Sequence, residues 1–280
     1  MSIVEINNLV KKYGDNVAVN DLSLNIDSKG VYGFLGPNGA GKSTTMNILT
    51  GYIGATSGTV KINGYDIFKE PEEAKKNVGY LPEIPPLYQD MTVYEYLEFV
   101  SKIKKIKKEE RKACIEQSLE MTRTTEVRER LIRNLSKGYK QRVGIAQAIM
   151  GMPDLIILDE PTVGLDPKQI IEIRDLIRNL GKEHTVILSS HILTEISEVC
   201  ENIFIISQGK LVASGREEEL IEELAGENRI EAIIKGDVKE IETILDEFGC
   251  KHSIEVMDDE KCKIQIVTSR EIDIREGLFF

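Results

Sequence analysis

The apolar residues in the first three-quarters of the chain gather in short continuous runs, separated by longer segments of mixed polarity. The clearest runs of apolar and β-branched residues cover positions 31–35, 155–158 and 185–188. A run without alternating polar positions is typical of a strand buried on both faces, as in a parallel sheet covered by helices. The pattern therefore predicts an α/β domain. Ligands of such sheets bind at the carboxyl ends of the strands, so the residues that follow each run are the first candidates for chemistry.

Residues from about 90 to 150 have a helical pattern instead. Thr92 and Glu95 have the spacing of a capping box, in which a hydroxyl at the helix N-cap and a carboxylate three residues later satisfy free backbone N–H groups. Because this segment lies between two of the apolar runs, we expect a helical subdomain inserted into the α/β domain.

The last part of the chain has the pattern of a separate small unit. A strand-like run at 203–206 is followed by a Gln-Gly turn, and we place a domain boundary at Gly215. Beyond it the pattern predicts a strand, a helix and two more strands, at residues 229–234, 238–248, 252–256 and 263–268. The chain is thus expected to divide into an α/β domain of residues 1–215 and an α+β accessory domain of residues 216–280.

Charge is spread unevenly over these two parts. The net charge is −11, and residues 216–280 hold 9 basic against 19 acidic side chains. A negative chain has the wrong sign for holding a nucleic-acid backbone over a broad surface. Aromatic residues make up only 6% and tryptophan is absent, so stacking surfaces for single strands are also few. We therefore expect no nucleic-acid partner.

Nothing in the sequence suggests a membrane span or export of the protein itself. No apolar run approaches the roughly 20 residues that a transmembrane helix needs, and the N-terminus does not resemble a signal peptide. The four cysteines form no Cys-x-x-Cys pair, which favours reduced thiols over a metal site. These features predict a soluble, cytoplasmic protein.

A phosphate-binding motif follows the first apolar run. Residues 36–43 read Gly-Pro-Asn-Gly-Ala-Gly-Lys-Ser and match G-x-x-x-x-G-K-[ST]. Glycines let backbone N–H groups curl around phosphate oxygens, and the helical stretch 44–50 would point its N-terminus at the same anion. In this motif Lys42 reaches the terminal phosphates and Ser43 binds Mg²⁺. The nucleotide-binding candidates are Gly36, Pro37, Asn38, Gly39, Ala40, Gly41, Lys42, Ser43 and Thr44.

Two acidic residues follow the second apolar run. Asp159 would complete the Mg²⁺ site, and Glu160 would act as the base that polarises an attacking water. Two adjacent acids are often only a solvated strand end, but beside a phosphate-binding loop the catalytic interpretation is preferred. With a base next to the metal and no motif for a second substrate, the pattern favours hydrolysis over transfer by a kinase.

These motifs, in this order, resemble the ATP-binding subunit of an ABC (ATP-binding cassette) transporter over residues 1 to about 215. The resemblance implies a P-loop NTPase fold, ATP and Mg²⁺ as cofactors, and ATP hydrolysis that drives transport through separate integral-membrane subunits. It also implies a peripheral position on the inner face of the cell membrane. ATP would be sandwiched head-to-tail between two cassettes, in a homodimer or a mixed pair.

The segment Leu-Ser-Lys-Gly-Tyr-Lys-Gln-Arg at 135–142 resembles the family's signature, which usually reads Leu-Ser-Gly-Gly-Gln. Ser136 and Gly138 are in place, whereas Lys137 replaces a glycine and Tyr139 replaces the glutamine. A plain serine N-cap is the alternative interpretation. Asp166, within Gly-Leu-Asp-Pro, resembles the D-loop that crosses the dimer interface. The resemblance implies that Ser136, Gly138 and Asp166 face the nucleotide of the partner cassette.

Three further residues stand at positions that have a role in the family pattern. His191 follows the third apolar run and resembles the switch histidine that contacts the γ-phosphate and positions the water, although a lone histidine is more often structural. Tyr13 resembles the aromatic residue that stacks on adenine, with core packing as the alternative. Glu83 stands where the family usually has the glutamine of its Q-loop. Both offer an oxygen to Mg²⁺ or water, but a glutamate adds negative charge beside Asp159 and Glu160, so its role stays open.

The remaining features leave alternatives. The basic stretch 102–111 suits a solvated helix face or a contact with anionic lipid headgroups. The signature, Glu83 and the α+β extension together resemble bacterial exporter-type cassettes, which tend to continue past residue 280, so a truncated chain is expected. A soluble ABC ATPase in nucleic-acid or translation work is the alternative function. Such proteins often have two cassettes or a long coiled-coil insert, and neither is found here.

Overall fold

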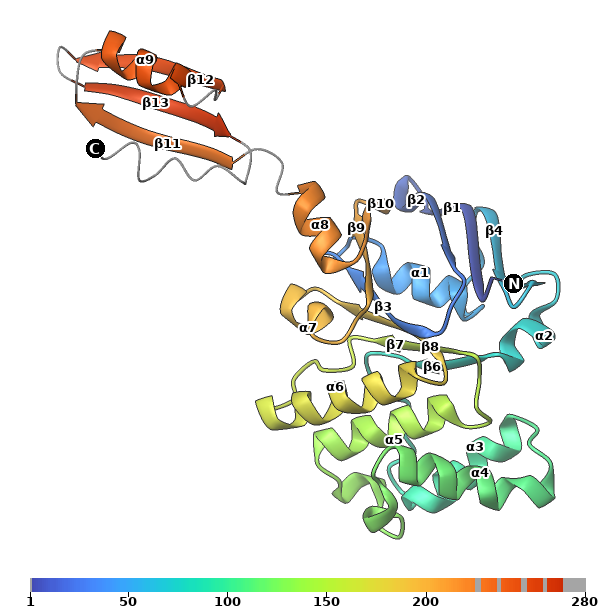
Figure 1. Cartoon of the computed structure of the whole chain (residues 1–280). Helices are drawn as coiled ribbons and strands as arrows, with labels where there is room; N and C mark the ends of the chain where they lie inside the picture. Colours follow the sequence, from blue (N-terminus) through green and yellow to red (C-terminus); the bar gives the residue numbers. More distant parts are fainter. Residues whose placement is uncertain (1, 225–227, 236–237, 248–250, 259–260, 269–280) are drawn as a thin grey trace. The chain divides into compact units, whose positions relative to one another are not determined.

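The computed structural model describes residues 2–224, 228–235, 238–247, 251–258 and 261–268. The chain divides into two compact units, one from Met1 to Glu217 and one from Glu218 to Phe280. The described strands of the first unit form two sheets, and those of the second unit form one (Figure 1). None of the described helices is long and apolar enough to cross a membrane.

The centre of the first unit is a six-stranded sheet with the strand order β10-β9-β3-β8-β7-β6. Its strands are β3 (Gly30–Leu35), β6 (Val78–Leu81), β7 (Leu155–Asp159), β8 (Thr185–Ser190), β9 (Asn202–Ser207) and β10 (Lys210–Gly215). All neighbours pair in parallel except β9 and β10. Every residue of β7 and β8 is buried, as the continuous apolar runs predict. The predicted α/β fold is therefore confirmed, and the strand ends that carry the motifs lie side by side.

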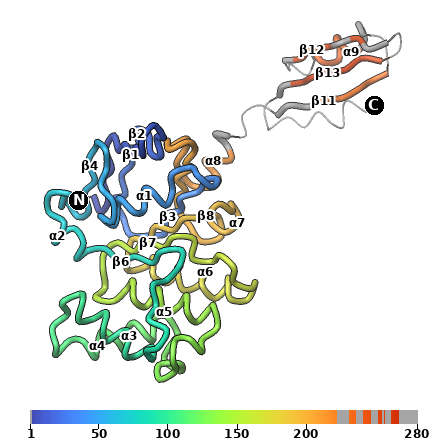
Figure 2. The backbone as a smooth tube through the Cα atoms, turned by 180° about the vertical axis from the view of Figure 1, so that it is seen from behind, coloured from blue at the N-terminus to red at the C-terminus, as the bar shows by residue number. Residues whose placement is uncertain are grey.

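A second, four-stranded antiparallel sheet in the same unit has no counterpart among the elements expected from the sequence. Its order is β2-β1-β4-β5, and its strands are β1 (Val4–Tyr13), β2 (Asn16–Ile26), β4 (Ser57–Ile62) and β5 (Tyr65–Asp66). Helix α1 (Lys42–Leu49) lies between this sheet and the central one (Figures 1 and 2). Side chains of α1 and of both sheets form one hydrophobic core, which holds α1 and the loop before it in place.

α6 (Pro167–Gly181) and the short α7 (Leu193–Ser197) contact β3 and β8, and α6 lies on the side of the central sheet away from α1 (Figure 1). α2 (Pro71–Lys76) contacts β5 and β6, and its Ala74 belongs to the same hydrophobic core as α1. The inserted subdomain consists of α3 (Val93–Ile103), α4 (Lys108–Met121), two 3-10 turns, η1 (Thr125–Val127) and η2 (Ile132–Asn134), and α5 (Lys137–Ile149). It has a hydrophobic core of its own, and α5 joins it to β6 and β7 of the central sheet.

The predicted capping box at the start of α3 is confirmed. Thr92 Oγ1 accepts a hydrogen bond from Glu95 N at 3.2 Å, and Glu95 Oε2 accepts one from Thr92 N at 2.8 Å. The basic stretch 102–111, in contrast, does not form a single helix face. It spans the end of α3, a turn and the start of α4, because Lys105 has a φ of 56° that interrupts the helix. The contact of this stretch with lipid headgroups stays a prediction.

The second unit contains β11 (Asn228–Lys235), α9 (Val238–Glu247), β12 (Lys251–Asp258) and β13 (Lys261–Thr268), in addition to most of α8 (Glu217–Leu224). The strands form an antiparallel sheet in the order β11-β13-β12. Ile241 and Leu245 of α9 cluster with three buried residues of β13, Cys262, Ile264 and Ile266. The unit is therefore a helix packed on a three-stranded sheet. The helix start expected at 272–276 lies outside the described residues.

Candidate nucleotide-binding and catalytic site

The loop between β3 and α1 requires glycine at two positions for steric reasons. A Cβ on Gly36 would lie 2.2 Å from Ile206 O, and one on Gly41 would lie 2.5 Å from Ala18 O. Gly41 also has a φ of 104°, in the region that favours glycine. The loop therefore passes against the backbone of β9 and β2 and delivers the chain into α1. That helix has no acidic residue in its first turn, so its positive N-terminal end is not neutralised by its own side chains.

Lys42 is held inside this loop. Its side chain is almost fully buried, and Nζ donates hydrogen bonds to Gly36 O at 2.7 Å and to Pro37 O at 3.3 Å. The same Nζ lies 3.8 Å from Glu160 Oε1. A buried ammonium group needs such partners, because desolvation of an unpaired charge is costly. The loop carbonyls thus fix the position of the ammonium group next to the acidic end of β7.

Ser43 and Asp159 are brought together as the sequence predicts. Ser43 Oγ donates to Asp159 Oδ1 at 3.4 Å, although the two residues come from α1 and the end of β7. A hydroxyl and a carboxylate are oxygen ligands of the kind that Mg²⁺ prefers. Among the described residues no group of three or more His, Cys, Asp or Glu side chains could hold a metal by itself. The donors therefore fit a Mg²⁺ ion that takes its other ligands from phosphate and water, the usual arrangement for this ion.

Glu160 has an unusual backbone and an unusual environment. Its φ is 48°, in the left-handed region that non-glycine residues rarely adopt, and the residue is only 8% exposed. Its carboxylate oxygens lie 3.1 Å and 3.3 Å from His191 Nδ1. Burial raises the pKa of Glu160, while the hydrogen bond and charge of His191 and the charge of Lys42 oppose the rise. A carboxylate with a raised pKa is a better proton acceptor, as a general base requires.

A pocket of about 850 Å³ joins most of the predicted nucleotide-binding residues. Its lining consists of Tyr13, Asn16, Val17, Ala18, Asn38, Gly39, Gly41, Lys42, Ser43, Thr44, Glu83, Glu160, Val163, His191 and Gln208. Gly36, Pro37 and Ala40 of the motif do not line it. Asp159, which is 4% exposed, does not line it either but contacts Ser43, which does.

Two of the lining residues had alternative interpretations. Tyr13 is 50% exposed at the end of β1, so the core-packing alternative is wrong for this side chain. Tyr13 lines the pocket, and Lys11 Nζ lies 5.0 Å from the centroid of its ring. Glu83 is exposed and makes no hydrogen bond or ion pair with any described residue. Its carboxylate is therefore available to a ligand in the pocket.

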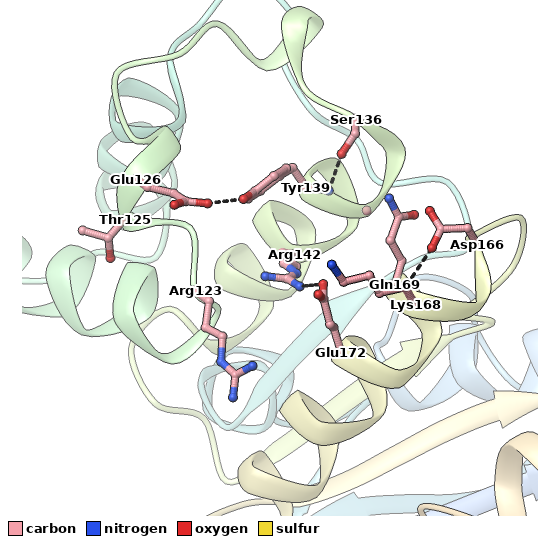
Figure 3. Close-up of a pocket in the computed structure, with 11 residues that line it drawn as sticks. Arg123, Thr125, Glu126, Ser136, Tyr139, Arg142, Asp166, Lys168, Gln169 and Glu172 are labelled. Atoms are coloured by element: carbon pink, nitrogen blue, oxygen red, sulfur yellow. Dashed lines mark hydrogen bonds and ion pairs between the residues drawn. The ribbon is translucent and has the colours of Figure 1, made fainter.

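Ser136, Gly138 and Asp166 line a different pocket, of about 600 Å³, between the N-terminal ends of α5 and α6 (Figure 3). Ser136 caps α5 by accepting a hydrogen bond from Tyr139 N at 3.4 Å, and Asp166 caps α6 by accepting one from Gln169 N at 2.9 Å. Within one chain, these residues are therefore not brought to the pocket that contains Lys42.

The two residues that depart from the usual signature are built into the same surface. Tyr139 Oη hydrogen-bonds to Glu126 of η1, and its ring centroid lies 5.6 Å from the Arg142 guanidinium, which pairs with Glu172 of α6 (Figure 3). The side chain of Lys137 extends over Gly164, the first residue of the D-loop. A Cβ on this glycine would lie only 2.1 Å from Lys137 Nζ. The substitutions thus add contacts between α5 and its neighbours.

Sequence reasoning missed several polar residues around the acids. Ser189 Oγ accepts a hydrogen bond from Glu160 N at 3.0 Å and donates to Asp159 Oδ1. Glu195 Oε2 accepts one hydrogen bond from Thr162 Oγ1 and one from Ser190 Oγ, both at 2.8 Å. The available signal was the appearance of polar residues at the end of an apolar run, which marks the carboxyl end of a buried strand.

A family profile described as "ABC transporter" matches residues 19–163. This chain belongs to the ABC transporter family. The chain is 42% identical to the bacitracin transport ATP-binding protein BcrA of Bacillus licheniformis over 213 aligned residues. The alignment covers 75% of this chain and 69% of that protein. The chain is also 35% identical to the linearmycin resistance ATP-binding protein LnrL of Bacillus subtilis, over 84% of this chain and 76% of that protein.

Solved structures give the same result for the cassette. An ATP-binding subunit of an ABC transporter superposes with a TM-score of 0.71 and 28% identity, over 80% of this chain and 93% of that chain. A dimeric cassette in a post-hydrolysis state, bound to ADP and phosphate, superposes with a TM-score of 0.67 and 27% identity, over 76% of this chain and 98% of that chain. The predicted ABC cassette fold and the predicted function, the ATP-binding and ATP-hydrolysing subunit of an ABC transporter, are thereby confirmed.

Proposed function

We propose that this cassette powers an exporter and that the residues around the 850 Å³ pocket carry out its ATP hydrolysis. The observation that carries this proposal is the convergence of Lys42, Glu160 and His191 on one pocket, next to the Ser43–Asp159 contact. A cation for phosphate, a base for water and a pair of Mg²⁺ ligands are the parts that hydrolysis of a phosphoanhydride needs.

Binding of the nucleotide is assigned to the loop and to Tyr13. The backbone N–H groups of Gly39 and Gly41 and the N-terminus of α1 would hold the phosphate oxygens, while Lys42 exchanges loop carbonyls for the terminal phosphates. Tyr13 presents an exposed ring at the pocket edge, on which an adenine base can stack. Ser43 and Asp159 would hold Mg²⁺, which neutralises phosphate charge when bound.

Hydrolysis is assigned to Glu160 and His191. Glu160 accepts a proton from the attacking water, and its burial favours this by raising its proton affinity. His191 Nδ1 contacts the same carboxylate and restricts its rotation, so that the base is aimed into the pocket. Glu83 reaches the same pocket from the end of β6, where its carboxylate would bind the metal or orient a water.

The second pocket supports a head-to-tail pair of cassettes. Ser136 and Gly138 sit at the N-terminus of α5, which attracts anions, yet the chain's own phosphate loop lines a different pocket. A second cassette would resolve this, because its phosphate loop and the first cassette's signature can enclose one ATP. Asp166 would then lie at the interface, next to the same composite site. The dimeric arrangement of a similar cassette supports this assembly.

The relatives support the proposals of export, of a membrane partner and of a position at the membrane. Two similar proteins are named for bacitracin transport and linearmycin resistance, and another for lipopolysaccharide export. We infer separate integral-membrane subunits as partners and a peripheral position on the inner face of the membrane, with no nucleic acid bound. The test is to isolate the tagged chain from its own cells after detergent extraction. We expect an integral-membrane protein to be recovered together with the tagged chain, in a complex that hydrolyses ATP. Recovery of ribosomes or nucleic acid with the chain instead would contradict the proposal.

The raised pKa of Glu160 predicts the pH dependence of turnover. The base must be deprotonated, so kcat is expected to fall as the pH falls through a pKa above the ordinary 4.5. Because the His191 hydrogen bond and charge lower this pKa, His191→Ala should move the acid limb to higher pH as well as reduce kcat. Steady-state rates of the wild-type chain and of His191→Ala from about pH 5 to 9, with saturating ATP, measure the acid limb of each protein. An unshifted limb in the variant would contradict the role assigned to this pair.

The domain division gives a further prediction. We propose that residues 1–215 form the ATPase domain and that residues 216–280 serve assembly or regulation. A chain that ends at Gly215 is expected to bind ATP as the full chain does, because every residue that lines the nucleotide pocket precedes this position. ATP affinity and dimerisation of both chains are the measurements. Loss of ATP affinity in a shortened chain that still folds would contradict the division.

A further inference from the structure

Ser189 occupies a central position beneath the catalytic acids. It is the penultimate residue of β8, is fully buried, and lies directly opposite Asp159 in the parallel register of β7 and β8. Its hydroxyl makes two hydrogen bonds with different partners. Oγ accepts the backbone N–H of Glu160 at 3.0 Å and donates its own proton to Asp159 Oδ1. One hydroxyl therefore joins the residue proposed to bind Mg²⁺ to the residue proposed to act as base.

The acceptor role matters because of the backbone at Glu160. This residue leaves the strand with a φ of 48°, a conformation that persists only when the surroundings hold it. The turn aims the Glu160 carboxylate at His191 and Lys42, and it directs the Glu160 N–H at the side-chain hydroxyl of Ser189 in the neighbouring strand β8. Without the Ser189 hydroxyl this buried N–H would lose its partner, which favours a rearranged turn.

The donor role matters for Asp159. Ser189 of β8 and Ser43 of α1 both donate to the same oxygen, Asp159 Oδ1. A carboxylate held by such a donor presents its second oxygen in a fixed direction. Groups that hydrogen-bond to a metal-binding carboxylate without contacting the metal fix its orientation. Removal of such a group typically reduces activity or metal affinity by about 10- to 100-fold.

We propose that Ser189 is a positioning residue for ATP hydrolysis, which fixes the Asp159 carboxylate and the Glu160 turn relative to each other. The inference rests on the proposed roles of these two acids. Ser189 does not line the nucleotide pocket, so it acts through them and not on the substrate. The loss of Ser189 Oγ should therefore reduce the rate of the chemical step more than the affinity for ATP.

The test is Ser189→Ala in the full chain, compared with Thr185→Val at the other end of β8. Thr185 is also fully buried, and its hydroxyl donates to Ser28 O at 3.2 Å, far along the strand from the acids. Both variants remove one buried hydroxyl from the same strand. Ser189→Ala is expected to lower kcat by about 10- to 100-fold with KM for ATP changed less than about threefold. Thr185→Val should leave both constants near wild type. A kcat unchanged in Ser189→Ala, or lowered equally in Thr185→Val, would overturn the proposal.

Ser189→Cys provides a second test of the positioning role, which can be carried out even if the alanine variant does not fold. The thiol is somewhat larger than the hydroxyl but keeps a polar atom at the same branch, as a weaker donor and acceptor, so kcat should lie below wild type and above Ser189→Ala, at an unchanged KM. A cysteine variant with wild-type kcat would exclude the positioning role. Glu160→Gln separates this inference from the proposed function. Full turnover in that variant would refute the role of Glu160 itself, whereas no turnover there together with normal Ser189→Ala would refute only the inference about Ser189.

Discussion

Glu160→Gln is expected to bind ATP as the wild-type chain does and to lose nearly all turnover. The amide has the size of the carboxylate and can still form hydrogen bonds, but it cannot accept a proton from water. Loss of a general base costs about 10² to 10⁴-fold in rate. Since Lys42 and the phosphate loop are unchanged, affinity for ATP is retained, and the ATP-bound pair of cassettes should accumulate.

Three measurements check this expectation. Phosphate release gives kcat, titration with ATP gives the affinity, and size-exclusion chromatography with ATP gives the oligomeric state. Glu109→Gln is a matched control, because Glu109 is exposed at the start of α4 and lies outside both pockets. This control should hydrolyse ATP normally. Turnover within a few-fold of wild type in Glu160→Gln would remove Glu160 from the role of base.

A mixture of two inactive variants is expected to regain activity. Lys42→Ala removes the ammonium group from the phosphate loop, and Ser136→Arg blocks the N-terminus of the signature helix. In a head-to-tail pair, one composite site combines both lesions, while the other combines an intact loop with an intact signature. Each variant alone has two damaged sites, so only the mixture contains a complete one.

The size of the effect is set by the fraction of mixed pairs. Random mixing of equal amounts gives about half mixed pairs, each with one intact site, so up to about a quarter of wild-type activity is expected if the two sites act independently. ATPase rates are measured for each variant alone and for the mixture after exchange of protomers. A mixture no more active than its parents would argue against the head-to-tail arrangement, unless the sites are strictly coupled. Mixing each variant with wild-type protein provides the control for exchange.

Local patterns predicted a large part of this protein. Continuous apolar runs were sufficient for β3, β7 and β8, because a strand buried on both faces must be apolar throughout. The phosphate loop and the Thr92–Glu95 box were also predictable, since each motif joins residues only a few positions apart. The antiparallel sheet of β1, β2 and β4 was not found. Its strands mix buried and exposed positions, and β1 pairs with β4 about fifty residues away.

The sequence by itself determined which chemical groups are present and at which strand ends they lie. Only the tertiary structure decided how these groups combine. The register of β8 against β7 places Ser189 opposite Asp159, and burial raises the pKa of Glu160. The fold also places Ser136 and Lys42 at separate pockets, although both belong to the predicted nucleotide site. Register, burial and distance depend on contacts between residues far apart in the chain, and spacing along the sequence does not contain them.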